Sequence, residues 1–163
     1  MTASNNQALP RWNVTDVHES LDARSFTDAL ELVGADVERL AVLFDELDIR
    51  STERSIEQAD GDKADRAIAE FNRVSDALNL LDAYVYSIVS TDSRHEHAQA
   101  VMSEINTTGS SLRPLLARLA DWVAALGADE IANVSAEARE HLGPLQRFAE
   151  RAAHQMPEAE EHL

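Results

Sequence analysis

Histidines that stand next to acidic residues are the side chains of this chain best suited to hold a metal ion. A zincin site places two histidines one helical turn apart, with a glutamate directly after the first. The pair His18–Glu19 is followed by Asp22 where the second histidine would stand, and His95 is followed by Gln99 at that position. Neither stretch therefore predicts a zinc site.

Two other histidine patterns also lack the spacing of a metal centre. His95 and His97 are two residues apart, so on a helix they point to different sides, and we expect both to be solvated. A di-iron bundle needs Glu-x-x-His pairs on facing helices, and no such pair occurs in the sequence. Glu150 and His154 are four residues apart, which predicts a surface pair on one helix.

The sequence contains no pattern typical of a catalytic nucleophile or of a phosphate-binding loop. The chain has no cysteine, and its five glycines form no phosphate-cradling motif. No serine stands in a nucleophile elbow. Trp12 and Trp122 are expected to be buried anchors, and Tyr84 and Tyr86 to lie on different faces of one helix, one in the core and one exposed. The residues alone thus predict no catalytic, cofactor-binding or metal-ligating side chain.

The charge of the chain argues against two classes of partner. Thirty acidic residues against fourteen basic ones give a net charge of −16 over 163 residues. Nucleic acid and anionic membranes would be repelled, and no basic cluster offsets the field locally. The polar amino terminus lacks the pattern of an export signal, so we expect a cytoplasmic protein. The arginine and alanine bias suggests a GC-rich bacterial source, and adaptation to salt is the alternative explanation of the strong acidity.

Three long stretches carry an apolar residue at alternating steps of three and four, which keeps one helical face apolar over many turns. The pattern predicts an all-α fold, an antiparallel bundle of long helices whose apolar faces bury one another. The three rows are Phe26, Leu30, Val33, Val37, Leu40, Phe44, Leu47; then Ala64, Ile68, Phe71, Val74, Leu78, Leu81, Val85, Ile88; then Ala98, Met102, Ile105, Gly109, Leu112, Leu116, Leu119, Val123, Leu126.

Capping signals set the expected bounds of the first two helices. Ser25 with Asp28 predicts a capping box and a first helix over about 26–49. The sequence Asp60-Gly61-Asp62 predicts a turn, so the second helix is expected over about 63–90, its face widened by Ala77, Leu80 and Tyr84. Residues 51–60 either continue the first helix or form a short one of their own.

The third helix is expected to begin at a second capping box, Ser93 with Glu96, and to bend at Pro114 without breaking. Gly109 on the buried row predicts the close approach of a neighbouring backbone, and Gly127 a helix end. Residues 128–142 predict a short helix or an irregular link. Gly143-Pro144 then predicts a cap and a first helical position, followed by a buried face of Leu145, Phe148, Ala149 and Ala152.

These signals divide the chain into three parts. Residues 1–25 are expected to be a tail and an extended amino-terminal arm, with Trp12, Val14, Val17 and Leu21 packing on the bundle. Residues 26–156 are expected to be the helical bundle lobe. Residues 157–163 begin with a proline followed by glutamates, which predicts the start of a further, truncated element; a frayed acidic tail is the alternative.

Four segments resemble the oligoendopeptidase F family of zinc metallopeptidases, and they occur in the family's order over nearly the whole chain. Two departures are His18, where the family usually has an aromatic residue, and a missing proline after Asp92. The segments are Pro10-Arg11-Trp12-Asn13-Val14-Thr15-Asp16-Val17 with Ser20-Leu21-Asp22 and Phe26; Ala83-Tyr84-Val85-Tyr86 with Ser90-Thr91-Asp92-Ser93-Arg94 and Ala98-Gln99-Ala100; Leu115-Leu116-Ala117-Arg118; and Leu145 to His154 with Glu158-Ala159-Glu160-Glu161.

The resemblance implies an amino-terminal lobe, or fragment, of a peptidase that hydrolyses short peptides. In that family the helical lobe forms one wall of a channel, and a later catalytic part carries the His-Glu-x-x-His zinc motif. This sequence has no such motif, so no catalytic or metal residue is carried over to any position and zinc is expected only in the full-length family protein. The implied partner is the missing carboxyl-terminal catalytic part.

Two other functions stay open. The chain could be a stand-alone acidic helical module that binds a partner protein, or a bundle metalloenzyme in its own right. The lobe hypothesis predicts an exposed apolar strip on one or two helices where the missing part would dock.

Overall fold

The computed structural model describes residues 13–51 and 54–154, and in these ranges it contains helices and no strands. The helices are α1 (Arg24–Glu46), α2 (Ala59–Thr91), α3 (Glu96–Leu126), α4 (Ala128–Val134), α5 (Ala136–Glu140) and α6 (Leu142–His154). The predicted all-α bundle is confirmed. The predicted tail at 1–9, Trp12 and the element at 157–163 lie outside the described residues.

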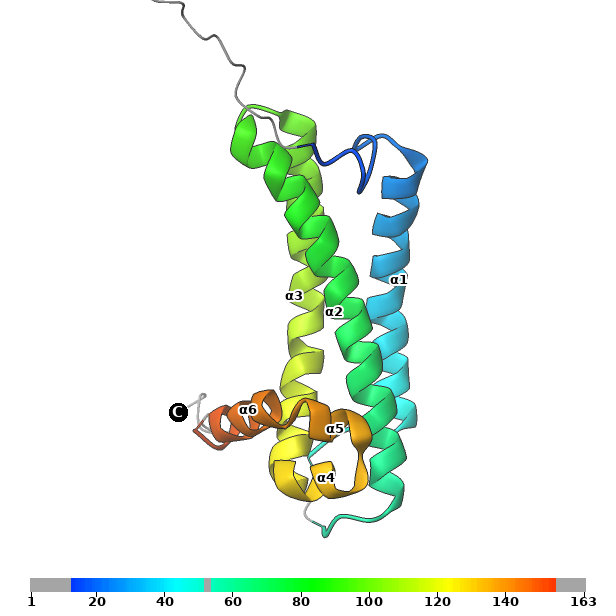
Figure 1. The fold of residues 1–163 in the computed structure, drawn as a ribbon, viewed down its shortest axis with the longest axis vertical. Coiled ribbons are helices and arrows are strands. Elements are labelled where there is room, and N and C mark those ends of the chain that lie inside the picture. Colours follow the sequence, from blue (N-terminus) through cyan, green and yellow to red (C-terminus); the bar gives the residue numbers. More distant parts are fainter. Residues whose placement is uncertain (1–12, 52–53, 155–163) are drawn as a thin grey trace, which may run out of the picture.

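The three long helices run antiparallel, with α1, α2 and α3 alternating in direction along the long axis (Figure 1). The arm before α1 crosses the end of the bundle where α2 gives way to α3. At the opposite end α4 and α5 close the bundle, and α6 lies across the lower part of α3. No helix in the described ranges has both the length and the apolar character to cross a membrane.

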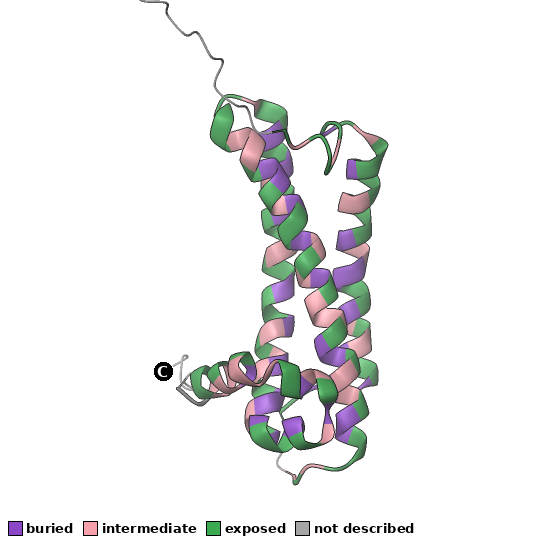
Figure 2. Cartoon of the chain, in the orientation of Figure 1, coloured by how far each residue is buried: buried purple, intermediate pink, exposed green. Residues whose placement is uncertain are grey.

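The core follows the rows of apolar residues along the inward faces of these helices (Figure 2). All of the first row is buried except Leu30, which is half-buried against the core. Trp122 is completely buried, as expected of an anchor. Leu80 is an error of the sequence prediction, because its side chain is 54% exposed on the outer side of α2.

Helix α1 ends at Glu46, three residues before the predicted end. Asp48 adopts a left-handed backbone conformation (φ 58°), and the Ile49 amide donates to the Phe44 carbonyl at 2.9 Å. This six-residue hydrogen-bonded closure terminates a helix and turns the chain sharply. Ile49 is thereby placed in the core with no exposed surface. Arg118 of α3 stabilises the turn by donating a hydrogen bond to the Asp45 carboxylate at 2.6 Å.

Neither predicted capping box forms. Helix α1 begins one residue before Ser25, whose hydroxyl instead pairs with the His18 ring at 3.3 Å. Helix α3 is capped by His95, whose side chain accepts from the Ala98 amide at 3.1 Å, two residues beyond Ser93. In both places a histidine at the arm end of the bundle replaces the predicted cap: His18 pairs with Ser25, and His95 caps α3. The spacing of serine and acidic residues does not predict these histidine contacts.

The predicted turn at residues 60–62 is also wrong, because α2 begins at Ala59 and runs through these residues. Asp60 is buried and accepts two hydrogen bonds from the Arg54 guanidinium, each at 2.7 Å. Gly61 faces the end of α4, where an added Cβ would lie 2.9 Å from the Val134 carbonyl carbon. The glycine therefore serves helix packing, and residues 51–58 link α1 to α2 without a helix of their own in their described part.

Helix α3 continues through Pro114 without a break, as predicted. In the preceding turns Thr107, Thr108 and Ser110 donate hydroxyl hydrogen bonds to backbone carbonyls four residues earlier. Such bonding is associated with bent helices. Gly109 does not meet a neighbouring backbone as predicted: its nearest neighbour is the Leu78 side chain, at an ordinary distance of 3.5 Å.

The segment after Gly127 forms two short helices and then α6. Helix α6 begins at Leu142, so Gly143 and Pro144 lie inside its first turn and Gly143 is not the predicted cap. Asp65 of α2 fixes the junction of α4 and α5, because its carboxylate accepts from the Ser135 hydroxyl at 2.5 Å and the Glu137 amide at 3.0 Å. On α6, Leu145 is buried, while Phe148, Ala149 and Ala152 are half-buried.

Substituting two glycines should separate helix propensity from packing. Gly61→Ala should destabilise the protein by about 1–3 kcal/mol, because its Cβ overlaps with the Val134 carbonyl. Gly34→Ala on α1 meets nothing within 4 Å and should stabilise by up to about 1 kcal/mol. Urea unfolding of both variants measures the effect, and a stabilising Gly61→Ala would contradict the α2–α4 contact.

Candidate functional site

The arm end of the bundle brings together residues from the two segments that carry most of the family resemblance. Tyr84 of α2 donates a hydrogen bond from its hydroxyl to the His18 carbonyl at 3.1 Å. The His18 ring packs edge-on against both Tyr84 and Phe26, with ring centroids 5.1 and 5.3 Å apart. Residues 66 positions apart in the sequence are thus joined at one aromatic cluster, Phe26, His18 and Tyr84.

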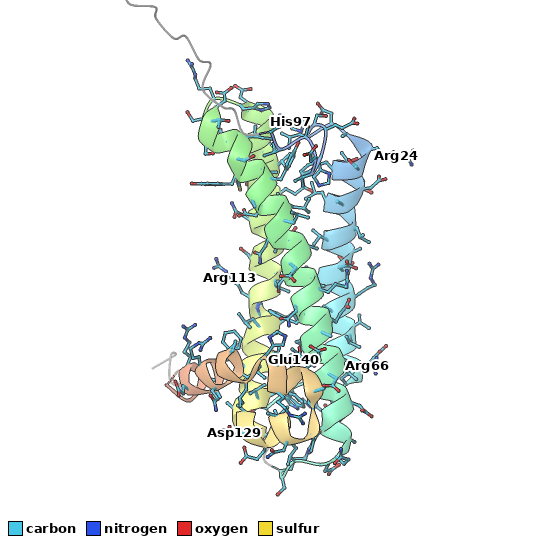
Figure 3. The ribbon with its side chains drawn as sticks, in the orientation of Figure 1. Arg24, Arg66, His97, Arg113, Asp129 and Glu140 are labelled. Atoms are coloured by element: carbon cyan, nitrogen blue, oxygen red, sulfur yellow. The ribbon has the colours of Figure 1, made fainter. Side chains whose placement is uncertain are left out.

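The turn that presents His18 is built from the arm itself. The Asn13 side chain accepts from the Thr15 amide at 3.0 Å and from the Thr15 hydroxyl at 2.7 Å, which closes an Asx turn. Leu21 is buried and Val14 half-buried, as predicted, whereas Val17 is 43% exposed and does not anchor the arm. His97, near the start of α3, lies 3.6 Å from the Asp22 carboxylate, so the arm also contacts α3 (Figure 3).

Burial raises the pKa of the Tyr84 hydroxyl, so that side chain stays a neutral hydrogen-bond donor near neutral pH. Tyr86, two residues on, is 63% exposed, which confirms that the two tyrosines lie on different faces of α2. The Ser25–His18 pair is the nearest approach to a nucleophile and base. A catalytic pair also needs a third group that orients the base, and no carboxylate bonds the His18 ring among the described residues.

Of the three histidines considered as metal ligands, His18 stands apart, whereas the centroids of the His95 and His97 rings lie 6.5 Å from each other. His18 lies in the arm, His95 caps α3 through its ring, and His97 is exposed beside Asp22. Within residues 13–51 and 54–154, no group of three or more histidine, aspartate or glutamate side chains is placed to hold a metal ion. The Glu150–His154 pair includes a side chain outside those described.

The sequence analysis did not identify two buried carboxylates, Asp36 and Asp60. Asp36 of α1 is 2% exposed and accepts from Arg73 of α2 at 2.8 Å and from Arg39. Arg73 also donates two hydrogen bonds to the Glu70 carboxylate, at 2.7 and 2.9 Å. The sequence does contain a signal for this buried carboxylate. Asp36 stands next to Val37 of the apolar row, and Arg39 follows three residues after it.

Neighbouring arginines keep the carboxylates Asp36, Asp60 and Glu70 ionised. The Arg73 guanidinium beside Asp36 lowers the pKa of that carboxyl, and the Arg54 guanidinium lowers the pKa of Asp60 to about 2. Arg73 likewise lowers the pKa of Glu70. A general acid near neutral pH needs a raised pKa, so these three carboxylates are suited to structural ion pairs and not to donating protons.

An apolar groove lies between α3 and α6. Its volume is about 240 Å³, and its lining comes from Leu116, Ala117 and Ala120 on α3 and from Phe148 and Ala152 on α6. Two arginines, Arg113 and Arg151, complete the lining. Arg113 extends from α3 on the side where α6 lies (Figure 3). The sequence analysis missed this groove because periodicity does not give the direction in which α6 crosses α3.

The other exposed apolar side chains are scattered. Leu32 and Val42 on α1 are separated by nearly three helical turns, and Leu80 and Tyr86 on α2 are also exposed singly. Among the described residues the exposed large apolar side chains therefore do not form the continuous strip that the lobe hypothesis predicts.

Removing the hydroxyl of Tyr84 tests the contact between the two segments. Tyr84→Phe should lower the free energy of unfolding by about 1 kcal/mol, because a buried hydrogen bond to the His18 carbonyl is lost. Tyr86→Phe alters an exposed residue and should stay within about 0.5 kcal/mol of wild type. Equal effects of the two substitutions in chemical unfolding would contradict the assignment.

Stability should fall in acid because of Asp60. The pKa of Asp60 is lowered on folding, so its contribution of about 2 kcal/mol is complete above about pH 5 and is lost as the pH falls from there towards 2. Asp60→Asn should remove this part of the pH dependence. The exposed Asp62 lies in the same turn, and Asp62→Asn controls for the loss of one charge. Identical pH profiles for Asp60→Asn and wild type would refute the role of Asp60.

Comparisons of this chain with protein-family models, with curated proteins and with solved structures each found no match. The resemblance to the oligoendopeptidase F family therefore rests on the residues of the sequence itself. Those residues include Phe26 and Tyr84 of the aromatic cluster, whereas His18 departs from the family pattern.

Proposed function

We propose that this chain is the amino-terminal helical lobe of an oligoendopeptidase F-like zinc metallopeptidase, a cytoplasmic enzyme that hydrolyses short peptides. The carrying observation is the contact between the two segments with the family-like sequence. The first segment supplies Phe26 of α1 and also His18, whose side chain departs from the family pattern, and the α2 segment supplies Tyr84. The hydrogen bond from Tyr84 to the His18 carbonyl and the ring contacts of His18 with Phe26 and Tyr84 hold the arm to the bundle. Because the two segments contact each other in the folded chain, a physical reason exists for both to occur in one sequence.

The described residues do not fit a zinc centre, so no step of peptide hydrolysis is assigned to them. In the proposed enzyme both the zinc and its ligands would belong to the catalytic part, where the metal would supply Lewis-acid activation of the carbonyl and of water. The chain of 163 residues supplies a rigid wall. Its long helices, with Asp36 and Arg73 joining α1 to α2, give that wall a fixed shape.

The strong negative charge of this wall would influence which peptides approach it. A surface with thirty acidic and fourteen basic residues attracts cationic peptides and repels anionic ones at low ionic strength. The lobe would thus contribute to the rate of peptide entry even though it takes no part in bond cleavage.

The reading frame beyond Leu163 tests the proposal. We expect it to continue to a His-Glu-x-x-His motif, and the longer protein to cleave a short fluorogenic peptide until a chelator removes its zinc. The 163-residue chain should not cleave that peptide. Replacing the motif glutamate by glutamine in the longer protein is the matched control for contaminating peptidases.

A reading frame that stops at Leu163 in an intact gene would contradict the proposal and favour the stand-alone interaction module. Chelator-sensitive cleavage by the purified 163-residue chain would contradict it in another way and favour a metalloenzyme of the bundle type.

A further inference from the structure

The α3–α6 groove combines an apolar lining with two positive charges. Its lining residues are apolar apart from Arg113 and Arg151. No acidic side chain among the described residues lines the groove, so the lining itself does not offset the charge of the two guanidinium groups. An occupant that suits this surface therefore carries carboxylates next to apolar side chains.

The dimensions of the groove favour a short peptide segment over a free small molecule. Its volume of about 240 Å³ is below the roughly 300–1,000 Å³ typical of small-molecule pockets. Ala117, Ala120 and Ala152 are short side chains, so a peptide backbone can lie close to α3 and α6. A few apolar side chains of that peptide would fill the remaining space.

Residues 155–163, which follow α6 and lie outside the described residues, have the matching composition. Three of them are glutamates and none is lysine or arginine, and Met156 and Leu163 stand on either side of the glutamates. Because the whole chain has a net charge of −16, most of its surface repels these glutamates, whereas Arg113 and Arg151 attract them. The segment therefore complements the groove in both charge and apolar character.

This segment is attached beside the groove. Ala152 lines the groove and stands two residues before α6 ends at His154. Pro157 has no amide hydrogen, so the hydrogen bonding of α6 cannot continue through it. The segment can span at most about 30 Å when extended, which is ample for a surface at its own attachment point. Tethering gives it an effective concentration on the order of millimolar, so even a weak contact would be occupied.

We propose that residues 155–163 bind in the α3–α6 groove of the same chain. Their glutamates pair with Arg113 and Arg151, and their apolar side chains contact the apolar lining. The groove is then covered by the chain itself, and another acidic peptide can bind there only by displacing the segment. This inference goes beyond the proposed function and does not depend on it.

Thiol labelling of the full chain tests whether the groove is covered, because the sequence has no cysteine of its own. Ala120→Cys places a thiol in the groove, and Arg24→Cys places one at the opposite end of the bundle, where the side chain is 92% exposed. Adding Glu158→Lys, Glu160→Lys and Glu161→Lys should make the groove thiol react with a maleimide at least about tenfold faster. The Arg24→Cys thiol should react at an unchanged rate. An unchanged rate at Ala120→Cys would overturn the inference.

A matched reversal on α1 controls for net charge. Asp28→Lys, Glu31→Lys and Glu38→Lys alter three exposed residues and change the charge of the chain by the same amount. Helix α1 does not contact α6 within the described ranges, so this variant should leave the labelling of Ala120→Cys unchanged. Equal acceleration by the two reversals would show an effect of overall charge and would also overturn the inference.

Charge exchange identifies the partners of the segment. Arg113→Glu and Arg151→Glu, added to the Ala120→Cys protein, should by themselves speed the labelling of the groove thiol. Combining them with the three segment substitutions should slow it again, because opposite charges then face each other once more. A groove that is merely damaged by the substitutions would not regain protection, so fast labelling of the combined variant would contradict the proposed pairing.

Dilution distinguishes the chain's own segment from that of a second copy. Protection by a segment of the same molecule is independent of protein concentration, whereas protection that grows with concentration would overturn the intramolecular contact. None of these measurements involves peptide cleavage. Failure of this inference therefore leaves the proposed function standing, and a reading frame that stops at Leu163 leaves this inference standing.

Discussion

Burial of three long apolar faces against one another is the constraint on which the rest of this structure depends. Each of α1, α2 and α3 carries an apolar row that would be exposed if the helix stood alone, and an isolated helix gains little stability from its own hydrogen bonds. Packing the three antiparallel rows together buries Phe44, Val85 and Val123 completely. The arm and the short helices then close the two ends of this core.

Buried polar contacts add specificity to a core made mostly of interchangeable aliphatic side chains. Asp36 joins α1 to α2, Asp60 holds the link before α2, and Asp65 positions the junction between α4 and α5. Desolvation of such charges offsets much of their attraction, whereas removing one partner would leave the other charge buried and uncompensated. The same pairing keeps Asp36 and Asp60 ionised, which fits a scaffold better than a catalytic centre.

The sequence predicted the long helices well because their apolar period is a property of each segment alone. It failed at their ends, where distant residues determine the bonding: Ser25 is bonded by His18, and α3 is capped by His95 in place of Ser93. Gly61 was interpreted as part of a turn because its packing against Val134 of α4 cannot be read locally.

The candidate site was predictable only in part, for a similar reason. The opposite faces of Tyr84 and Tyr86 follow from helical geometry, and so does the burial of one of them. The hydrogen bond from Tyr84 to the arm and the groove beside Arg113 depend instead on how separate elements meet. Both are properties of tertiary packing, which the sequence pattern of a single segment does not contain.

The fluorescence of Trp122 tests most directly whether the three helices share one core. In a Trp12→Phe variant, Trp122 reports alone from a fully buried position on α3. The account predicts blue-shifted emission that acrylamide hardly quenches, lost on heating at the same midpoint as the helical circular dichroism signal. Emission typical of an indole in water, or loss of the blue shift well before the helices melt, would contradict a single shared core.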